Sequence, residues 1–154
     1  MKPISKADRV ILDLMQQDGR ITIESLAEAC GLSPSSTQRR VQKLRTQKFI
    51  TGDIAVVDPR SLGFSFTAIV ELEVDHDRPE LARALHSWIA THPEIQNAWH
   101  VTGRGDYILS VIAPSVEDFD QLMERLMSEN RLVRKYTTSV ALKTLKRTQA
   151  VPVD

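Results

Sequence analysis

The sequence is poor in cysteine and has no long hydrophobic run, and these absences exclude several classes of protein. Among its 154 residues there is one cysteine, Cys30, so an internal disulfide is impossible. It contains no run of about 18 apolar residues and no amino-terminal signal pattern. We therefore expect a cytoplasmic protein without a membrane span. Its 42% hydrophobic content is that of ordinary globular domains and does not indicate disorder.

Patterns that carry metal or catalytic chemistry are also missing. The four histidines form no pair at metal-ligand spacing, and Cys30 falls on an apolar helical stripe where a small buried residue is expected. No Ser/His/Asp, Cys/His or paired-carboxylate arrangement occurs at a diagnostic spacing. We expect no metal, no cofactor and no enzymatic activity.

The net charge is zero, but the charges are unevenly distributed along the chain. Residues 1–60 carry ten Lys/Arg and seven Asp/Glu, whereas residues 61–154 carry ten and thirteen. Phosphate contacts depend on the local field at the groove, so a mildly acidic second half is compatible with nucleic-acid binding by the first.

Residues 22–50 predict two short helices joined by a glycine-containing turn. The first helix has Thr22 as its N-cap and ends at Gly31, and Ser33 before Pro34 starts a second helix over 34–47. Apolar residues at helical spacing form the buried stripe of the first helix: Ile23, Leu26, Ala27 and Cys30. A further helix from Lys6 to Gln17 supplies a third stripe and completes a small core.

The second helix is basic on one side and packs on the other. Thr37, Val41, Leu44 and the stem of Lys48 share the inner side, and five Lys/Arg occur within residues 39–48. Arg and Lys pair with guanine and Gln with adenine, so this helix is predicted to enter the major groove of double-stranded DNA. The candidate DNA-binding residues are Thr22, Ser33, Ser35, Ser36, Gln38, Arg39, Arg40, Gln42, Lys43 and Arg45.

Two other interpretations of these helices remain open. A basic amphipathic helix is usually a solvated surface, and a helix-turn-helix can also serve protein contacts in a ligand-binding or assembly module. The intact helix, turn and capped helix order favours DNA.

The rest of the chain predicts a wing, a linker and a second domain. Phe49 to Val57 can form a hairpin that would be a wing, giving a winged helix-turn-helix domain over 1–57. Residues 58–64 have turn residues without periodicity and form the predicted linker, and 65–154 form the second domain.

Strand and helix patterns alternate in this second domain. Strands are predicted over 66–74, 95–102, 107–113 and 133–145, and helices over 79–92 and from Ser115 onward. The order βαββαβ is that of an α+β, ferredoxin-like domain with both helices on one face of an antiparallel sheet. Its bare face predicts a homodimer, and two symmetric recognition helices predict an approximately palindromic target.

Several short motifs in this order resemble the Lrp/AsnC family, the feast/famine transcription regulators of bacteria and archaea. The resemblance covers nearly the whole chain. It is carried by GLSPS at residues 31–35 before the basic RRVQKL at 39–44, and by DP at 58–59, LG at 62–63, VTGRGDY at 101–107 and TTSV at 137–140.

The resemblance implies a regulator whose second domain, which is ACT-like, binds a small metabolite, commonly an amino acid, and assembles dimers further, usually to an octamer. The implied effector-binding residues are His100, Thr102, Gly103, Arg104, Gly105, Asp106, Thr137 and Thr138. Glycines let backbone N–H groups converge on a carboxylate, Arg104 can add a charged contact, and Asp106 can receive an α-ammonium group. A Gly-x-Gly-Asp run between strands is otherwise an ordinary tight turn. The same architecture is used by tetrapyrrole-decarboxylating relatives, which makes an enzyme the main alternative.

Overall fold

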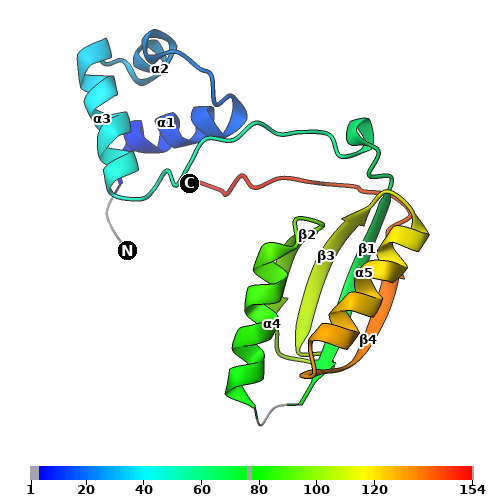
Figure 1. Cartoon of the computed structure of the whole chain (residues 1–154). Helices are drawn as coiled ribbons and strands as arrows, with labels where there is room; N and C mark the ends of the chain where they lie inside the picture. Colours follow the sequence, from blue (N-terminus) through cyan, green and yellow to red (C-terminus); the bar gives the residue numbers. More distant parts are fainter. Residues whose placement is uncertain (1–3, 76–77, 154) are drawn as a thin grey trace. The chain divides into compact units, whose positions relative to one another are not determined.

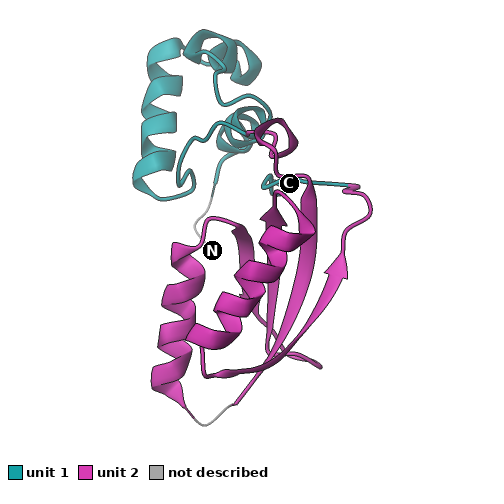
Figure 2. Ribbon diagram, turned by 45° about the vertical axis from the view of Figure 1, so that its right-hand side comes forward, with its two compact units in different colours: residues 1–56, 146–154 teal, residues 57–145 magenta. Residues whose placement is uncertain are grey.

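The computed structural model describes residues 4–75 and 78–153, and the chain forms two compact units (Figure 2). Unit 1 contains residues 1–56 together with 146–154, and unit 2 contains residues 57–145. Each unit has its own hydrophobic cluster of buried residues.

Unit 1 is built from three helices, each started by a capping side chain: α1 (Lys6–Gln17), α2 (Ile23–Cys30) and α3 (Pro34–Thr46) (Figure 1). Ser5, Thr22 and Ser33 accept a hydrogen bond from the backbone three residues later, which satisfies one of the unpaired N–H groups of each first turn. The apolar stripes of the three helices meet in a core of Ile11, Leu12, Leu26, Val41 and Leu44. The three predicted helices are therefore confirmed, with α3 ending at Thr46.

The predicted wing over 49–57 is wrong for this structure. Residues 51–58 form no strand, and Ile54 and Val56 are 70% and 88% exposed. Phe49 and Ile50 instead pack against the core of unit 1. An isolated two-stranded hairpin is marginal in water, and here its first residues are drawn into the core.

Unit 2 is a four-stranded antiparallel sheet with two helices on one face (Figure 1). After a short 3₁₀ turn, η1 (Arg60–Leu62), its elements are β1 (Phe66–Val74), α4 (Pro79–Thr91), β2 (Ile95–His100), β3 (Tyr107–Ala113), α5 (Val116–Glu129) and β4 (Val133–Val140). The strand order is β2-β3-β1-β4. The ferredoxin-like α+β fold predicted from the alternating patterns is confirmed.

Successive side chains of each strand point to opposite faces of the sheet, and their burial shows which face the helices cover. Val70 and Leu109 are fully buried and belong to the core that includes Leu85 of α4 and Leu126 of α5. Ile69, on the opposite face of β1, is 41% exposed. One face of the sheet is thus open in the single chain.

The last strand and the residues after it differ from the prediction. β4 ends at Val140 rather than Leu145, because its pairing with β1 stops at Ala68, close to the start of that strand. Residues 146–154, which we assigned to the second domain, pack with unit 1 instead. There Arg9 donates a 2.7 Å hydrogen bond to the Val153 carbonyl, and the Gln16 amide exchanges hydrogen bonds of 3.1 and 2.7 Å with the Val151 backbone.

Candidate nucleic-acid interface and effector site

The turn between α2 and α3 is fixed by backbone conformation and by caps. Gly31 ends α2 in the left-handed region, at φ 63°, where residues with a Cβ are disfavoured. The Ser33 hydroxyl accepts from the Ser36 N–H at 3.3 Å, and Pro34 occupies the first turn of α3. Thr22 has the same capping role on α2, accepting from Ser25 N–H at 3.1 Å. Two of the predicted DNA-binding hydroxyls therefore already accept hydrogen bonds within the motif.

The two sides of α3 differ as the periodicity predicts. Thr37, Val41 and Leu44 are at most 8% exposed and face the core of unit 1. Six of the predicted DNA-binding residues that belong to α3 itself are exposed: Ser35, Gln38, Arg39, Gln42, Lys43 and Arg45. We call these six residues the reading face, because their hydrogen-bonding groups are accessible on a helix whose other side is anchored.

Arg40 is placed differently from its neighbours on α3. Its guanidinium donates to the Asp8 carboxylate of α1 at 2.9 Å and to the Ser5 hydroxyl at 3.1 Å. Burial alone would raise the pKa of the Asp8 carboxyl, but hydrogen bonds from Ser5 and Arg40 outweigh it and hold that pKa below its ordinary value. Among the predicted DNA-binding residues, Arg40 thus ties α3 to α1.

Arg45 also has an acidic partner, but an exposed one. It contacts Asp53 at 2.6 Å, and both side chains are about two-fifths exposed. Such a surface pair is weak in water, so the Arg45 guanidinium can exchange Asp53 for a phosphate at small cost.

The turn between β2 and β3 is bound to the end of β1 through Asp106. The Asp106 N–H donates to the Leu72 carbonyl at 2.8 Å, and its carboxylate accepts from the Val74 N–H at 2.7 Å. Thr102, Gly103 and Arg104 are exposed in this turn. One Asp106 oxygen, which we expected to receive an ammonium group, thus has a structural hydrogen bond.

Glu71 is a neighbour of this turn that the sequence analysis missed. A Cβ built on the buried Gly105 would lie 2.3 Å from Glu71 Cγ, so the turn backbone rests directly on this side chain. Glu71 is also opposite Thr137 in the pairing of β1 with β4. The position of Glu71 on the open face follows from strand alternation, but its contact with Gly105 requires the sheet order.

The predicted effector residues do not all share one face of the sheet. His100 is paired with the buried Tyr107 and stacks on its ring, with centroids 4.7 Å apart. Thr138 is opposite the buried Val70, so it also points to the helix-covered side, whereas Thr137 points to the open side. The structure therefore brings Thr137 and the 102–106 turn together near Glu71. It places the side chains of His100 and Thr138 on the opposite, helix-covered face of the sheet.

Trp88 of α4 and Cys30 of α2 pack in or against the hydrophobic cores of their units. Trp88 is 8% exposed, belongs to the core of unit 2 and donates to Glu129 at 2.8 Å. Burial raises the pKa of the Cys30 thiol. Within residues 4–75 and 78–153, no three His, Cys, Asp or Glu side chains are grouped as metal ligands, and no helix is long and apolar enough to cross a membrane.

Both units match models of one protein family. A model described as the Lrp/AsnC ligand binding domain matches residues 67–151, more than half of the chain, and an AsnC-type helix-turn-helix domain matches residues 4–45. The chain belongs to the Lrp/AsnC family. The predicted family and the predicted DNA-binding transcription regulator are confirmed.

Curated Lrp/AsnC relatives align with this chain over nearly its full length. The HTH-type transcriptional regulator y4tD of Sinorhizobium fredii is 32% identical over 98% of this chain and 89% of its own. The transcriptional activator DecR of Escherichia coli is 27% identical, over 98% and 99% of the two chains. These relatives are transcriptional regulators, a class of protein that is not enzymatic.

Solved Lrp/AsnC structures share the fold of this chain. An AsnC family regulator from Agrobacterium tumefaciens superposes with a TM-score of 0.92 at 25% identity, covering 97% of each chain. A regulator from Neisseria meningitidis, solved as a complex with L-methionine, gives a TM-score of 0.93 at 24% identity, covering 99% of this chain and 98% of its own.

Proposed function

We propose that this regulator binds an approximately palindromic operator as a symmetric dimer, with α3 of each protomer in the major groove. The observation that carries the proposal is the reading face, six exposed polar or basic side chains on a helix anchored by Thr37, Val41 and Leu44. Arg39, Gln38 and Gln42 are suited to base edges, and Lys43 and Arg45 to phosphates. A protein of this kind works beside the chromosome, so we place it in the cytoplasm.

The open sheet face supports dimerisation. Ile69 and Trp99, 41% and 51% exposed, are on the same face, because Ile69 and Glu71 are opposite Ser110 and Ile108 of β3, and Ile108 is opposite Trp99 of β2. Stacking two such faces removes this apolar surface from water, and further contacts between dimers would give the octamer expected for the family. Ile69→Lys should shift the species measured by analytical ultracentrifugation toward monomer. An unchanged dimer would exclude this face.

The effector is proposed to be an amino acid bound at the 102–106 turn. Arg104 is exposed there for a carboxylate, and the exposed backbone of Gly103, with no other atom within 4 Å of a built Cβ, leaves room for close approach. The regulator of Neisseria meningitidis was solved with L-methionine, which favours this ligand class. A thermal-shift screen of the twenty amino acids identifies it, because ligand at a hundred times its Kd stabilises by about 2.7 kcal/mol.

Fluorescence anisotropy with the DNA upstream of the regulator's own gene tests operator binding. We expect Arg39→Ala to cost about 1–3 kcal/mol and to relax one base preference, and Arg45→Ala to weaken all sequences alike. If the wild-type protein binds no DNA at any salt concentration, the proposed function is wrong.

Arg104→Ala is the suitable effector variant, because Asp106 also holds the end of β1. It should abolish the amino-acid-dependent change in operator affinity while leaving the thermal stability of the free protein unchanged. A full response in Arg104→Ala would place the effector elsewhere.

A further inference from the structure

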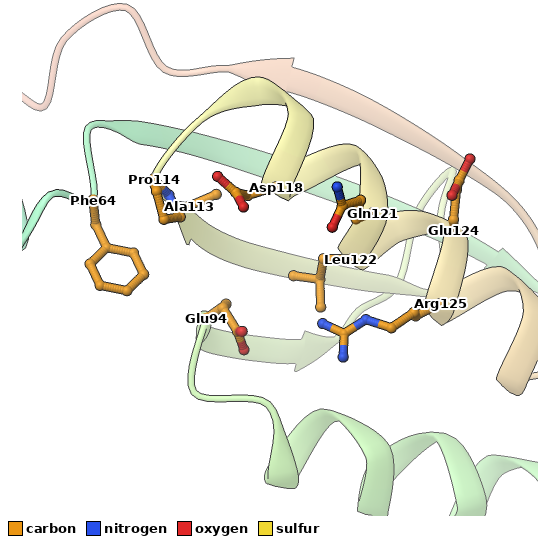
Figure 3. A pocket seen from close by; sticks show the side chains of 9 residues that line it. All are labelled: Phe64, Glu94, Ala113, Pro114, Asp118, Gln121, Leu122, Glu124 and Arg125. Atoms are coloured by element: carbon orange, nitrogen blue, oxygen red, sulfur yellow. The ribbon is translucent and has the colours of Figure 1, made fainter.

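Unit 2 has a pocket of about 460 Å³ at the end of the sheet opposite the 102–106 turn (Figure 3). It lies where β2 begins and β3 ends, against the part of α5 from Asp118 to Arg125 and the residue Phe64. Its apolar lining is provided by Phe64, Ala113, Pro114 and Leu122. This volume is within the range of small-molecule sites.

Glu94 contributes a carboxylate to this pocket that no described residue satisfies. Its Oε2 atom is shielded from solvent, and within residues 4–75 and 78–153 no donor reaches it. The backbone of Glu94 is fixed, since its carbonyl accepts from the Ile112 N–H at 2.9 Å. A buried acceptor without a donor is costly, so an ammonium or other donor placed in the pocket would be favoured.

Arg125 supplies the opposite charge from α5. It lines the same pocket, and Figure 3 shows its guanidinium beside Leu122, on the side of the pocket where Glu94 lies. Among the described residues its side chain makes no hydrogen bond or ion pair. Two other acidic residues line the pocket. Asp118 already accepts from the Ser115 hydroxyl at 2.7 Å, and Figure 3 shows the Glu124 carboxylate directed away from Glu94 and Arg125. The Glu94 carboxylate and the Arg125 guanidinium are therefore the two opposite charges available on this side of the pocket, with the Gln121 amide as a further polar group in its lining.

We propose that this pocket is a second ligand site, which takes a free amino acid with an apolar side chain. The Glu94 carboxylate accepts from the α-ammonium group, the Arg125 guanidinium donates to the α-carboxylate, and the side chain lies against Phe64 and Leu122. The opposite charges favour a zwitterion over a simple amine or a simple acid. The site uses none of the residues of the 102–106 turn, so it does not depend on the effector site proposed above.

Isothermal titration of the full chain with L-leucine tests the proposal, with 4-methylpentanoate and 3-methylbutylamine as analogues that lack one charge each. In Arg104→Ala, which removes the first site, L-leucine should still bind, and each analogue should bind at least tenfold more weakly. Adding Glu94→Gln should weaken L-leucine at least tenfold and leave 4-methylpentanoate unchanged. Adding Arg125→Met should weaken L-leucine and 4-methylpentanoate, but not the amine.

Three results would overturn the second site. One is the absence of L-leucine binding in Arg104→Ala, and another is equal binding of L-leucine and both analogues. The third is wild-type affinity in the Glu94→Gln and Arg125→Met variants, each checked by circular dichroism to be folded. If L-leucine does not bind to Arg104→Ala and the Arg125→Met change lowers the melting temperature, Glu94 and Arg125 pair with each other in solution and the pocket is closed. Operator binding is measured separately, so its failure is distinguishable from each of these.

Discussion

Replacing Arg40 with alanine should weaken the fold of unit 1 and leave the DNA-reading residues in place. Arg40 is on the recognition helix, and composition alone groups it with Arg39. Its guanidinium, however, is directed toward α1, where it contacts the Asp8 carboxylate at 2.9 Å and the Ser5 hydroxyl at 3.1 Å. The Arg39 side chain is exposed. We therefore expect the loss of Arg40 to lower the stability of unit 1 and the loss of Arg39 to lower operator affinity.

The size of the effect follows from the burial of the pair. Hydrogen bonds to charged groups contribute about 1.5–3 kcal/mol when shielded, and exposed ion pairs about 0–1 kcal/mol. The Asp8 side chain is 16% exposed and that of Arg40 is 35% exposed, which is between these limits. We expect Arg40→Ala to cost about 1–2 kcal/mol, which in a domain of this size lowers the melting temperature by about 5–10 °C.

Calorimetric melting of Arg40→Ala, with Arg39→Ala as the matched control, measures this difference. Operator affinity is read by anisotropy well below both melting temperatures. Arg40→Ala should melt at a lower temperature and bind the operator nearly as the wild type does. Arg39→Ala should melt as the wild type does and bind the operator more weakly. Wild-type melting of Arg40→Ala together with a loss of affinity equal to that of Arg39→Ala would refute the structural role and return Arg40 to the reading face.

Three other changes have defined outcomes. The folded-state pKa of Asp8 is lowered, so its contribution to the free energy of unfolding is present above the unfolded pKa of about 3.9 and is lost as the pH falls through the folded pKa. Asp8→Asn should remove this part of the acid dependence of stability, measured by urea titration at several pH values. Gly105→Ala should destabilise unit 2 by about 1–3 kcal/mol, because its Cβ meets Glu71, and Glu71→Ala in the same chain should restore most of the loss in urea unfolding. Deleting residues 146–154 should destabilise unit 1 by about 1–2 kcal/mol, which lowers its calorimetric melting temperature by about 5–10 °C, and should leave unit 2 unchanged, since the hydrogen bonds of Val151 and Val153 go to α1.

Elements with local signals were predicted well from the sequence. Thr22, Gly31, Ser33 and Pro34 mark the ends of α2 and α3, because caps and left-handed turns depend on single residue types. The strands of unit 2 follow from alternation along the chain. In each case the deciding interaction is within a few residues, where a linear pattern is informative.

Features that depend on distant residues were not predicted. Phe49 and Ile50 had the pattern of a strand but joined the core of unit 1, and that competition is not visible locally. Arg40 lies near the border of its helix face, so only its contact with Asp8 shows which way the guanidinium turns. The contact of Gly105 with Glu71 depends on β1 lying beside β3.

The docking of the carboxyl-terminal residues on α1 has a consequence for how the protein is made. Arg9 and its partner Val153 are 144 residues apart, so α1 leaves the ribosome long before its partner has been translated. Domains usually fold in the order in which they emerge, amino-terminal first. Here the DNA-binding unit emerges first but is completed last, after β4 has been synthesised. A nascent chain can therefore hold a finished sheet while its DNA-binding unit still lacks the contacts of Val151 and Val153.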